Sequence, residues 1–322
     1  MPARVSVLMT VYNPGPFLRP ALDSLFAQSF ADFELIAIEN GSTDGSKEFL
    51  RQVADPRLRL IDLDHNIGRT PALIRALAEA RGDLVAVLDA DDLALPERFE
   101  RQVAFLDQHQ AIALVTSAAE WFNDGDGTHG LIIPPCDHDG LVAAFAAAQN
   151  PVVHSAVMMR RQAVLDVGGY SAAFVYSQDL ALYLALVRAG FKLAALPEVL
   201  ARLRVHSGSM SASPEHSVIR CREALILFKL VRRLPGVTRA ALRQAHHPLT
   251  DIMVDYGTAL IPSGRRLAGY GWLLRAFLRD PWHAGSNGKF QDWVIRPIPG
   301  LLSLLRRFKP TLGLMRRSSG KE

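Results

Sequence analysis

Two patterns of hydrophobic positions alternate over the first 122 residues. One is a short apolar run rich in Val, Ile and Leu, which predicts a buried β-strand. The other places apolar side chains three or four residues apart, as an amphipathic helix does. The predicted strands are residues 5–12, 33–40, 58–63, 83–90 and 111–122. The predicted helices follow them, within residues 13–29, from residue 46 onward, at 70–81 and at 96–109.

Proline and glycine mark where some of these helices begin and end. Pro71 and Pro96 stand at the start of two helices, where the N–H that proline lacks would have no partner. Gly82 follows the end of one helix, a usual place for glycine. Because strands alternate with helices, we expect right-handed crossovers and a mainly parallel, twisted sheet with helices on both faces. This is a Rossmann-like α/β fold.

The pattern is less regular beyond residue 122. A polar segment at residues 123–130 predicts a turn or loop. The elements expected after it are a helix at 141–150, a strand at 155–160, a short helix at 161–170, a helix at 177–190 and a strand with a proline break at 191–206. From residue 215 the apolar positions have helical spacing, so we expect a C-terminal helical extension.

Charge divides the chain at nearly the same place. Residues 1–214 carry 17 Lys and Arg against 25 Asp and Glu, whereas residues 215–322 carry 19 against 7. We therefore expect two regions with different partners, a domain at 1–214 and a basic helical region at 215–322. No recognised nucleic-acid-binding motif accompanies the positive charge, which argues against DNA or RNA as a partner.

Composition bears on the compartment. Hydrophobic residues make up 49% of the chain and charged residues 21%, as in ordinary globular proteins. The two cysteines, Cys136 and Cys221, lie far apart, which argues against a disulfide scaffold or a cysteine zinc site and fits a reducing cytoplasm. The N-terminus resembles a first strand more than a signal peptide, and no apolar run reaches ~18 residues, so we expect no membrane-spanning helix.

Polar side chains gather where the predicted strands end. In α/β sheets of this kind, ligands bind beyond the carboxyl ends of the strands. Three of the predicted strands end in polar groups: Thr10, Tyr12 and Asn13 after the first, Glu39 and Asn40 after the second, and Asp89, Asp91 and Asp92 after the fourth. Their position at one edge of the sheet predicts a binding site there.

The acidic sequence DADD at 89–92 has the form of a metal site. In an extended segment alternate side chains point the same way, so Asp89 and Asp91 can face one cavity. Mg²⁺ and Mn²⁺ prefer oxygen ligands, commonly one or two carboxylates together with substrate phosphates. The sequence therefore predicts Mg²⁺ or Mn²⁺ bound with a diphosphate. The plainer alternative is a solvated acidic loop that caps the next helix.

Several segments in order resemble one known family. They are VSVLMTVYN, ELIAIENGSTDGS, NIGRTPALIRALAEARGDLVAVLDADD, GGYSAAFVYSQDLALYLALVRAG and RVHSGSMS. Together they are similar to the inverting glycosyltransferases of family 2, which have the GT-A fold, and the similarity covers residues 4–211. It implies transfer of a sugar from a nucleotide-diphosphate donor, for which we expect UDP, to a hydroxyl of a glycan or lipid-linked acceptor. It also implies inversion at the anomeric carbon and, usually, a divalent metal.

The resemblance implies roles for individual residues. Asp91 matches the metal ligand, Asp89 the acid near the donor ribose and the metal, and Asp179 the general base. His206 matches a histidine near the metal or diphosphate, so the implied metal set is Asp91, Asp89 and His206. With Arg69, which could reach a phosphate, and Ala90, the residues predicted to bind the nucleotide sugar are Thr10, Tyr12, Asn13, Glu39, Arg69, Asp89, Ala90 and Asp91.

Each of these residues also has an ordinary structural explanation. Asp179 can serve as a helix N-terminal charge, His206 as a loop histidine and Tyr12 as core packing. Glu39 and Asn40 can form a turn, Arg69 can be a surface arginine, and His154 can be either structural or on the acceptor side.

The sequence departs from the family pattern at three places. Glu39-Asn40 replaces the usual pair of aspartates, and Gln178 replaces the glutamate that usually precedes the base. After NIG, the segment ALI at 72–74 stands where the family often has ARN. These changes leave the metal acid and the base in place, so we expect activity. A non-catalytic scaffold subunit that binds nucleotide sugar is the alternative.

Two other enzyme classes fit less well. Sugar-nucleotide pyrophosphorylases usually have a glycine-rich loop after the first strand, and TVYNPGPF does not match it. Dinucleotide-dependent oxidoreductases carry G-x-G-x-x-G at this place, which is also missing. The resemblance to family 2 thus stays the basis of the prediction, and it implies a transferase that acts in surface polysaccharide synthesis.

The basic region contains two amphipathic segments, GYGWLLRAFLRDPW at 269–282 and IPGLLSLLRRFKP at 298–310. Helices of this composition can lie in a membrane interface with Lys and Arg toward anionic lipid. The predicted location is therefore cytoplasmic and peripheral on the inner face of the cell membrane. The alternatives are a soluble helical layer and a contact within an oligomer.

Overall fold

The computed structural model describes residues 3–206, 216–290 and 292–293. The described chain forms two compact units, one of residues 3–206 and 226–243, the other of residues 216–225, 244–290 and 292–293. The functional division predicted at residue 214 stays a prediction.

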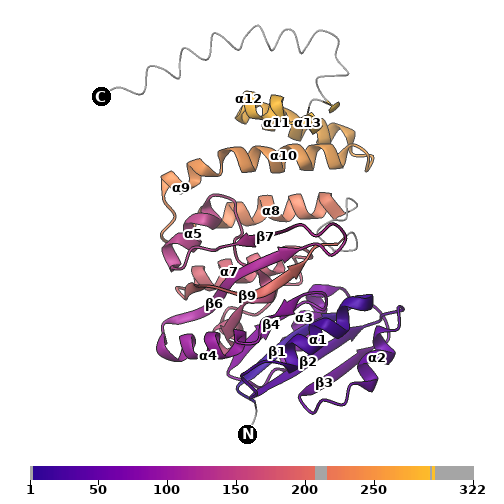
Figure 1. Cartoon of the computed structure of the whole chain (residues 1–322). Helices are drawn as coiled ribbons and strands as arrows, with labels where there is room; N and C mark the ends of the chain where they lie inside the picture. Colours follow the sequence, from indigo (N-terminus) through magenta and orange to yellow (C-terminus); the bar gives the residue numbers. More distant parts are fainter. Residues whose placement is uncertain (1–2, 207–215, 291, 294–322) are drawn as a thin grey trace. The chain divides into compact units, whose positions relative to one another are not determined.

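Nine strands of the described chain form one sheet in the first unit (Figure 1). Their order is β3-β2-β1-β4-β8-β6-β9-β5, and β7 pairs with β6. The strands are β1 Val5–Val11, β2 Phe33–Asn40, β3 Leu58–Leu63, β4 Leu84–Val87, β5 Leu93–Ala94, β6 Ile112–Phe122, β7 His129–Ile132, β8 Met158–Arg160 and β9 Lys192–Arg204.

The sheet is mostly parallel, as predicted. Parallel ladders join β1 to β2 and β4, β2 to β3, and β6 to β9. The shorter strands supply the antiparallel pairs: β8 pairs with β4 and β6, β7 with β6, and β5 with β9. The carboxyl ends of β1, β2 and β4 therefore meet at one edge, which positions the site.

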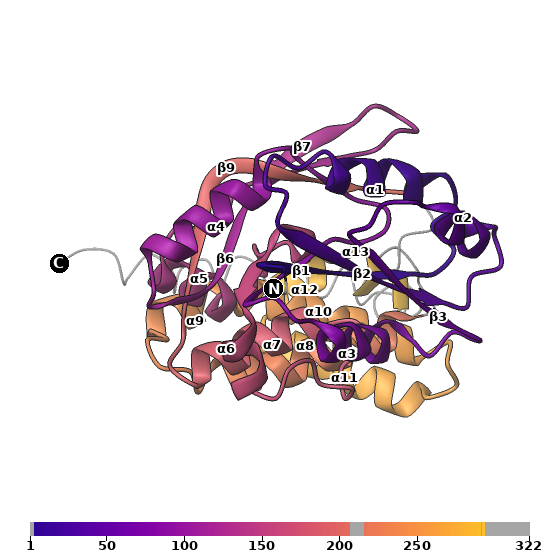
Figure 2. The ribbon, with the colours of Figure 1, turned by 90° about the horizontal axis from the view of Figure 1, so that it is seen from below.

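Helices cover both faces of this sheet. Figure 2 shows α1 and α4 on one side of β1 and β2, and α3 and α7 on the other. The helices of the first unit, with two 3-10 turns, are η1 Gly15–Phe17, α1 Leu18–Phe26, α2 Ser46–Gln52, α3 Arg69–Glu79, α4 Arg98–Gln108, α5 His138–Ala146, η2 His154–Ala156, α6 Arg161–Asp166, α7 Gln178–Arg188 and α9 Arg239–Gln244. The helix α8, Ser217–Val231, contributes its residues from 226 onward.

The sheet has two apolar faces because alternate side chains of a strand point to opposite sides. In β1, Val7 and Met9 pack with α1 and α4, while Leu8 packs with α3 and α7. All three are fully buried. This explains why the central strands are continuous apolar runs and not alternating ones. Leu227 and Val231 of α8 join the second of these cores.

The structure corrects some predicted boundaries. The fourth strand ends at Val87, three residues before the predicted end, because the acidic sequence folds into a turn. The strand predicted at 155–160 begins only at Met158, since 154–156 form a 3-10 turn. The short strands β5 and β7 were not predicted; with two and four residues, they are too short to show a period.

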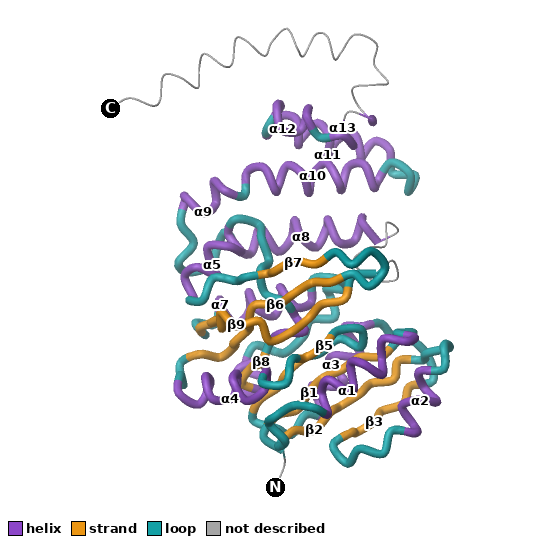
Figure 3. The backbone as a smooth tube through the Cα atoms, viewed as in Figure 1, coloured by secondary structure: helices purple, strands orange, loops and turns teal. Residues whose placement is uncertain are grey.

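The proline break predicted in the last strand is a bulge. The ladder between β6 and β9 passes from Leu196 to Val199, which leaves Pro197 and Glu198 outside the register. Figure 3 shows β6 and β9 as neighbouring strands. Proline has no N–H to donate, and a bulge is where a strand tolerates it. The strand therefore continues to Arg204, next to the acidic turn.

The second unit is helical, as predicted. Besides the start of α8 it contains α10 His246–Leu260, α11 Arg266–Arg279, α12 Pro281–Ser286 and α13 Gly288–Phe290. Two glycines let α10 and α11 approach closely, since a Cβ on Gly269 would lie 2.7 Å from the carbonyl oxygen of Gly257. In the described chain no helix is both long and apolar enough to span a membrane. The amphipathic segment predicted at 298–310 lies outside the described residues.

Candidate active site

The acidic turn after β4 brings three carboxylates together. The N–H of Asp92 donates to the carbonyl of Asp89 at 3.2 Å, which closes the turn. One carboxylate oxygen each of Asp89, Asp91 and Asp92 lies within 4.8 Å of the other two. Asp92 is buried, whereas the side chains of Asp89 and Asp91 keep 26% and 30% of their surface exposed. Asp89 and Asp91 are therefore the accessible acids.

An arginine and a histidine lie against these acids. Nη2 of Arg69 lies 2.7 and 2.6 Å from the two carboxylate oxygens of Asp89. Nε2 of His206 lies 3.1 Å from Oδ2 of Asp91. Burial disfavours a charged Arg69, but the carboxylates of Asp89, Asp179 and Asp91 outweigh it and raise the pKa of the guanidinium. Arg69 is thus a fixed positive charge among three acids.

Asp92 connects the acidic turn after β4 to the end of β9 through hydrogen bonds. Its Oδ2 accepts a hydrogen bond from Ser155 Oγ at 2.5 Å, and its Oδ1 accepts one from the N–H of Arg204 at 2.9 Å. Ser155 Oγ also accepts from the N–H of Asp89 at 3.1 Å. The end of β9, which carries His206, is thereby held to the turn that carries Asp89 and Asp91.

The acids fit a hard divalent cation. Burial and the charge of Asp89 raise the pKa of Asp91, although the hydrogen bond from His206 opposes this. Burial and the charges of Asp89 and Asp91 raise the pKa of Asp92 more strongly. Burial and the mutual repulsion of the three carboxylates therefore act in the same direction. Two accessible carboxylates and an imidazole are suitable ligands for Mg²⁺ or Mn²⁺.

The loops after β1 and β2 are built by side-chain hydrogen bonds. Glu39, fully buried, accepts from the N–H groups of Gly41 at 3.1 Å and Ser42 at 2.6 Å. Oδ1 of Asn13 accepts from the N–H of Thr43 at 2.7 Å, which fastens one loop to the other. Glu39 thus forms the turn, as its structural explanation requires, and its role toward a base stays a prediction.

Tyr12 and Asn40 settle two of the open alternatives. Tyr12 is 50% exposed, so core packing does not explain it. Asn40 is buried and accepts from the N–H of Ile67 at 2.9 Å, while its amide donates to Asn66 at 3.1 Å. Asn40 therefore shapes the loop that leads into α3 and Arg69.

Asp179 lies in the first turn of α7, where the helix dipole favours its charge. Its Oδ2 accepts a long hydrogen bond of 3.4 Å from the amide of Asn150. Its charge contributes to the raised pKa of Arg69, so Asp179 faces the same group as Asp89 and Asp91. The fold thereby brings together acids that are about ninety residues apart in the chain.

The sequence of this unit matches a known family. The family model described as glycosyl transferase family 2 matches residues 6–168, half of the chain. The chain belongs to glycosyl transferase family 2. It is therefore a glycosyltransferase, and the sequence prediction of family and enzyme class is confirmed.

Named relatives support the assignment. The glycosyltransferase is 30% identical over 237 residues to EpsE of Bacillus subtilis, across 72% of this chain and 83% of EpsE. It is 28% identical to the amylovoran biosynthesis glycosyltransferase AmsE of Erwinia amylovora, across 77% and 94%. It is also 29% identical, across 56% and 66%, to the Escherichia coli UDP-Gal:alpha-D-GlcNAc-diphosphoundecaprenol beta-1,3-galactosyltransferase.

Solved structures show the same fold. Staphylococcus aureus TarS (residues 1–349, with UDP-GlcNAc) superposes with a TM-score of 0.60 at 16% identity, over 86% of this chain and 92% of that one. The mannosyltransferase PcManGT of Pyrobaculum calidifontis, with GDP-Man and Mn²⁺, gives 0.58 at 16% identity, over 96% and 87%. The predicted GT-A fold of the glycosyltransferase is confirmed.

The remaining predicted residues lie in or beside the site. Thr10 is near the end of β1 and half-buried. The methyl group of Ala90 lies in the core, so only the backbone of this residue can reach a donor. Gln178 is buried. With its side-chain amide turned so that the nitrogen faces acceptors, that nitrogen donates to the backbone carbonyls of Tyr176 and Val175. Gln178 thus braces the loop before Asp179.

His154 proves to be buried behind the glycosyltransferase site. Its Nδ1 lies 2.8 Å from the hydroxyl of Tyr183, and its Nε2 lies 3.2 Å from that of Tyr170. Burial lowers the pKa of His154 and raises the pKa of both tyrosines, so the three rings stay neutral. Tyr183 lies one helical turn after Asp179, so these contacts fix that face of α7.

Sequence reasoning missed Ser155 and Arg98. Arg98 is fully buried, and its Nη2 donates to the carbonyls of Val87 and Val157 at 2.9 Å each. Burial lowers the pKa of Arg98 to about 9, although the charge of Asp92 opposes the shift. One signal was present, because Arg98, Gln102 and Leu106 follow one another at intervals of four residues along one face of α4. A charged side chain on the apolar face of a helix predicts a buried group that hydrogen-bonds within the core.

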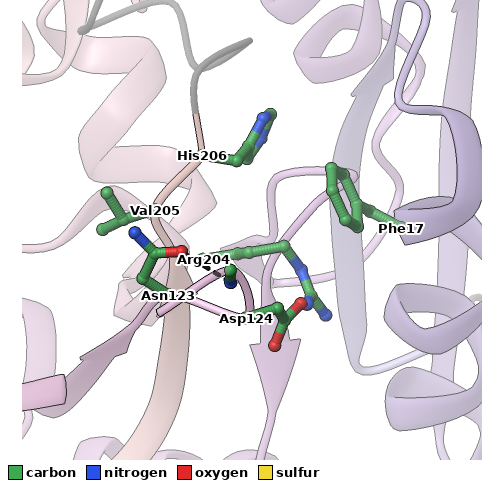
Figure 4. A pocket seen from close by; sticks show the side chains of 7 residues that line it. Phe17, Asn123, Asp124, Arg204, Val205 and His206 are labelled. Carbon is green, nitrogen blue, oxygen red and sulfur yellow. Dashed lines mark hydrogen bonds and ion pairs between the residues drawn. The ribbon is translucent and has the colours of Figure 1, made fainter. Parts of the chain in front are cut away.

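A hollow of about 540 Å³ opens beside His206 (Figure 4). The figure shows the side chain of Arg204 reaching toward Asp124 and Phe17. Arg204 forms an ion pair with Asp124, and its guanidinium lies 4.7 Å from the ring centre of Phe17. The hollow is lined by Phe17, Asn123, Asp124, Gly125, Arg204, Val205 and His206.

Proposed function

We propose that this glycosyltransferase moves a sugar, with inversion, from a UDP-linked donor to a hydroxyl of a lipid-linked glycan in polysaccharide biosynthesis. The observation that carries the proposal is that the accessible carboxylates of Asp89 and Asp91 lie together in one turn, with Arg69 2.6 and 2.7 Å from the oxygens of Asp89 and His206 3.1 Å from Asp91. Carboxylates that can hold a divalent cation, next to the positive charge of Arg69, fit a phosphate-bearing ligand.

Relatives support the donor and acceptor classes. The name of the Escherichia coli relative specifies UDP-Gal as donor and a diphosphoundecaprenol-linked sugar as acceptor. The name of AmsE places that protein in amylovoran biosynthesis. TarS was solved with UDP-GlcNAc, while PcManGT was solved with GDP-Man. UDP is therefore our choice of nucleotide, and a GDP-linked sugar is the competing donor that the binding screen below includes.

Asp89, Asp91 and His206 are the residues that would hold Mg²⁺ or Mn²⁺. Such an ion, when bound, would neutralise the negative charge that develops on the leaving diphosphate. The protein's own part is to hold the ligands in place: Ser155 and Asp92 fix the acidic turn to β9. Arg69 and Arg204 add positive charge beside the ligands, which favours a leaving diphosphate.

Asp179 is the proposed general base. A sugar hydroxyl is a weak nucleophile at neutral pH, so a carboxylate oxygen must accept its proton as it attacks. Asp179 lies in the first turn of α7, at the positive end of the helix dipole, and the pair formed by His154 and Tyr183 behind it fixes the helix. An attack from the face opposite the leaving diphosphate inverts the anomeric carbon.

We also propose that the protein works at the cytoplasmic face of a membrane, peripherally. An enzyme that acts on a lipid-linked acceptor must reach the membrane surface. The net positive charge of residues 215–322 would attract them to anionic lipid. The finding that no described helix could span a membrane is compatible with this location.

A thermal-shift screen of nucleotide sugars tests donor binding. We expect a UDP-sugar with Mn²⁺ to raise the unfolding temperature by mass action, and Asp91→Ala to lose the part of the shift that depends on Mn²⁺. Asp23→Ala is the matched control, because Asp23 is an exposed aspartate on α1. A larger shift with GDP-sugars would reject the UDP assignment.

An assay of transfer to a lipid-linked sugar, in which the release of nucleoside diphosphate is measured, tests the chemistry. We expect Asp179→Asn to bind the donor normally and to lose transfer by at least about 100-fold, the size of a general-base contribution. Normal turnover by Asp179→Asn would refute its role as base. Donor binding by the wild type without any release of nucleoside diphosphate would favour the scaffold alternative.

A further inference from the structure

One face of α11 is an unpartnered apolar stripe. Leu267, Tyr270, Leu274 and Leu278 are spaced three or four residues apart, so they lie on one side of the helix. Their exposed fractions are 92%, 46%, 57% and 71%. Isolated exposed leucines are ordinary, but four apolar side chains in register on one helix mark a contact surface.

The opposite face of α11 already has its partner. Gly269, Leu273 and Ala276 are buried, and Gly269 and Leu273 lie against Gly257 of α10. The rotation of α11 is therefore fixed by small residues on its inner side. The leucine stripe (Leu267, Tyr270, Leu274 and Leu278) therefore faces outward because the opposite face of α11 packs on α10.

Arginines flank the leucine stripe. Arg266 and Arg275 are exposed, and the guanidinium of Arg275 lies 4.7 Å from the ring centre of Trp272. α11 contains no Asp or Glu, and Asp280 directly after it is buried and bound by His246 and His247. An apolar stripe with a cationic border and no acids is the pattern of a helix that lies in a lipid interface.

We propose that the leucine stripe of α11 docks the protein on an anionic lipid surface. The leucines would enter the boundary between headgroups and acyl chains, and Arg266 and Arg275 would meet anionic headgroups. Two other partners could cover the stripe, residues 294–322 of the same chain or a second copy of α11, and charge argues against both. Residues 294–322 carry seven Lys and Arg against one Glu, and a second copy of α11 would bring the same arginines. Either would place like charges around the stripe.

This inference is independent of the sugar chemistry. Docking of α11 uses residues of the second unit only, whereas the proposed reaction uses residues of the first. The inference rests on the proposed peripheral location. A failure of lipid binding would count against that location but would leave donor binding and hydrolysis untouched, so docking and sugar transfer can fail separately.

Vesicle flotation of the full chain tests the proposal. We expect the wild type to bind vesicles of phosphatidylcholine with 30% phosphatidylglycerol, a composition chosen as a roughly bacterial level of anionic lipid, and to bind pure phosphatidylcholine far less. The variant Leu267→Ser/Leu274→Ser/Leu278→Ser is expected to lose at least about tenfold in partitioning. The variant Arg266→Gln/Arg275→Gln is expected to lose the preference for anionic vesicles and to keep weak binding to neutral ones.

A matched control separates the stripe from exposed apolar surface in general. Leu131 and Ile133, at and beside β7 in the first unit, are 60% and 65% exposed. The variant Leu131→Ser/Ile133→Ser is expected to bind vesicles like the wild type. All variants should keep the wild-type unfolding temperature and the wild-type rate of donor hydrolysis in solution, because none of these side chains is buried.

Three results would overturn the proposal. Absence of wild-type binding to anionic vesicles would reject docking. Unchanged binding by the triple leucine variant would move the lipid contact elsewhere, with residues 294–322 as the next place to look. A concentration-dependent dimer of the wild type that becomes monomeric in the triple leucine variant would assign the stripe to a second copy.

Discussion

At the scale of single residues, the site depends on side chains that never need to touch a substrate. Asp92 and Ser155 are both buried and use their oxygen atoms to bind each other and the backbone of Asp89 and Arg204. The accessible acids Asp89 and Asp91 are thus held by a buried hydrogen-bonded pair. Such supporting groups commonly change metal affinity when they are removed.

Removing the Ser155 hydroxyl should weaken both the fold and the metal site. Ser155→Ala leaves one oxygen of the buried Asp92 carboxylate without its donor, which costs about 1–3 kcal/mol of unfolding free energy. We also expect Mn²⁺ affinity, measured by calorimetry in the presence of nucleoside diphosphate, to fall about 10–100-fold.

Thr116→Val is the control for this prediction. The hydroxyl of Thr116 is buried without a hydrogen-bond partner in the described chain, so its removal should leave stability and Mn²⁺ affinity unchanged. Equal losses in both variants would show that any buried hydroxyl near the sheet has this effect, and the special role of Ser155 would be rejected.

At the scale of elements, a single capping residue marks the start of α5. Asp137 precedes α5 in an extended conformation, and its side chain accepts from the N–H of Gly140 at 2.7 Å. Asp137 is exposed, so the cap is its main contact. The predicted helix at 141–150 begins earlier, at His138, because this cap lies outside the apolar periodicity that predicted the helix.

Asp137→Ala should destabilise the first unit by about 1 kcal/mol, since one N–H at the start of α5 loses its acceptor. Asp137→Asn keeps an acceptor oxygen and should behave like the wild type within a few tenths of that value. Chemical denaturation followed by circular dichroism measures both. A loss as large in the Asn variant would point to the charge of Asp137, and not to the cap.

At the scale of the whole molecule, the C-terminal region does not form a unit by itself. Residues 226–243 belong to the compact unit that contains the sheet, although the charge pattern groups them with the basic region. Leu227 is 1% exposed within one of the two main cores. Burial thus assigns these residues to the catalytic unit, which net charge alone could not do.

Two neighbouring residues of α8 test this assignment. Leu227→Ala should destabilise the first unit by about 2–5 kcal/mol, because it opens a cavity in the core. Ile226→Ala is the control, since Ile226 is 38% exposed and its truncation should change stability by less than about 0.5 kcal/mol. Equal effects of the two substitutions on the denaturation midpoint would contradict the packing of α8 into this unit.

The sequence by itself determined the strands of the first 122 residues other than the two-residue β5, the polar strand ends and the family, because these depend on local periodicity and on short motifs. Only the tertiary structure decided that Asp92 is a buried tie, that Arg69 lies among three acids, and that Ser155 and Arg98 support the turn. It also decided which leucines of α11 face outward. Burial and hydrogen-bond partners arise between residues distant in the chain, and no local pattern encodes them.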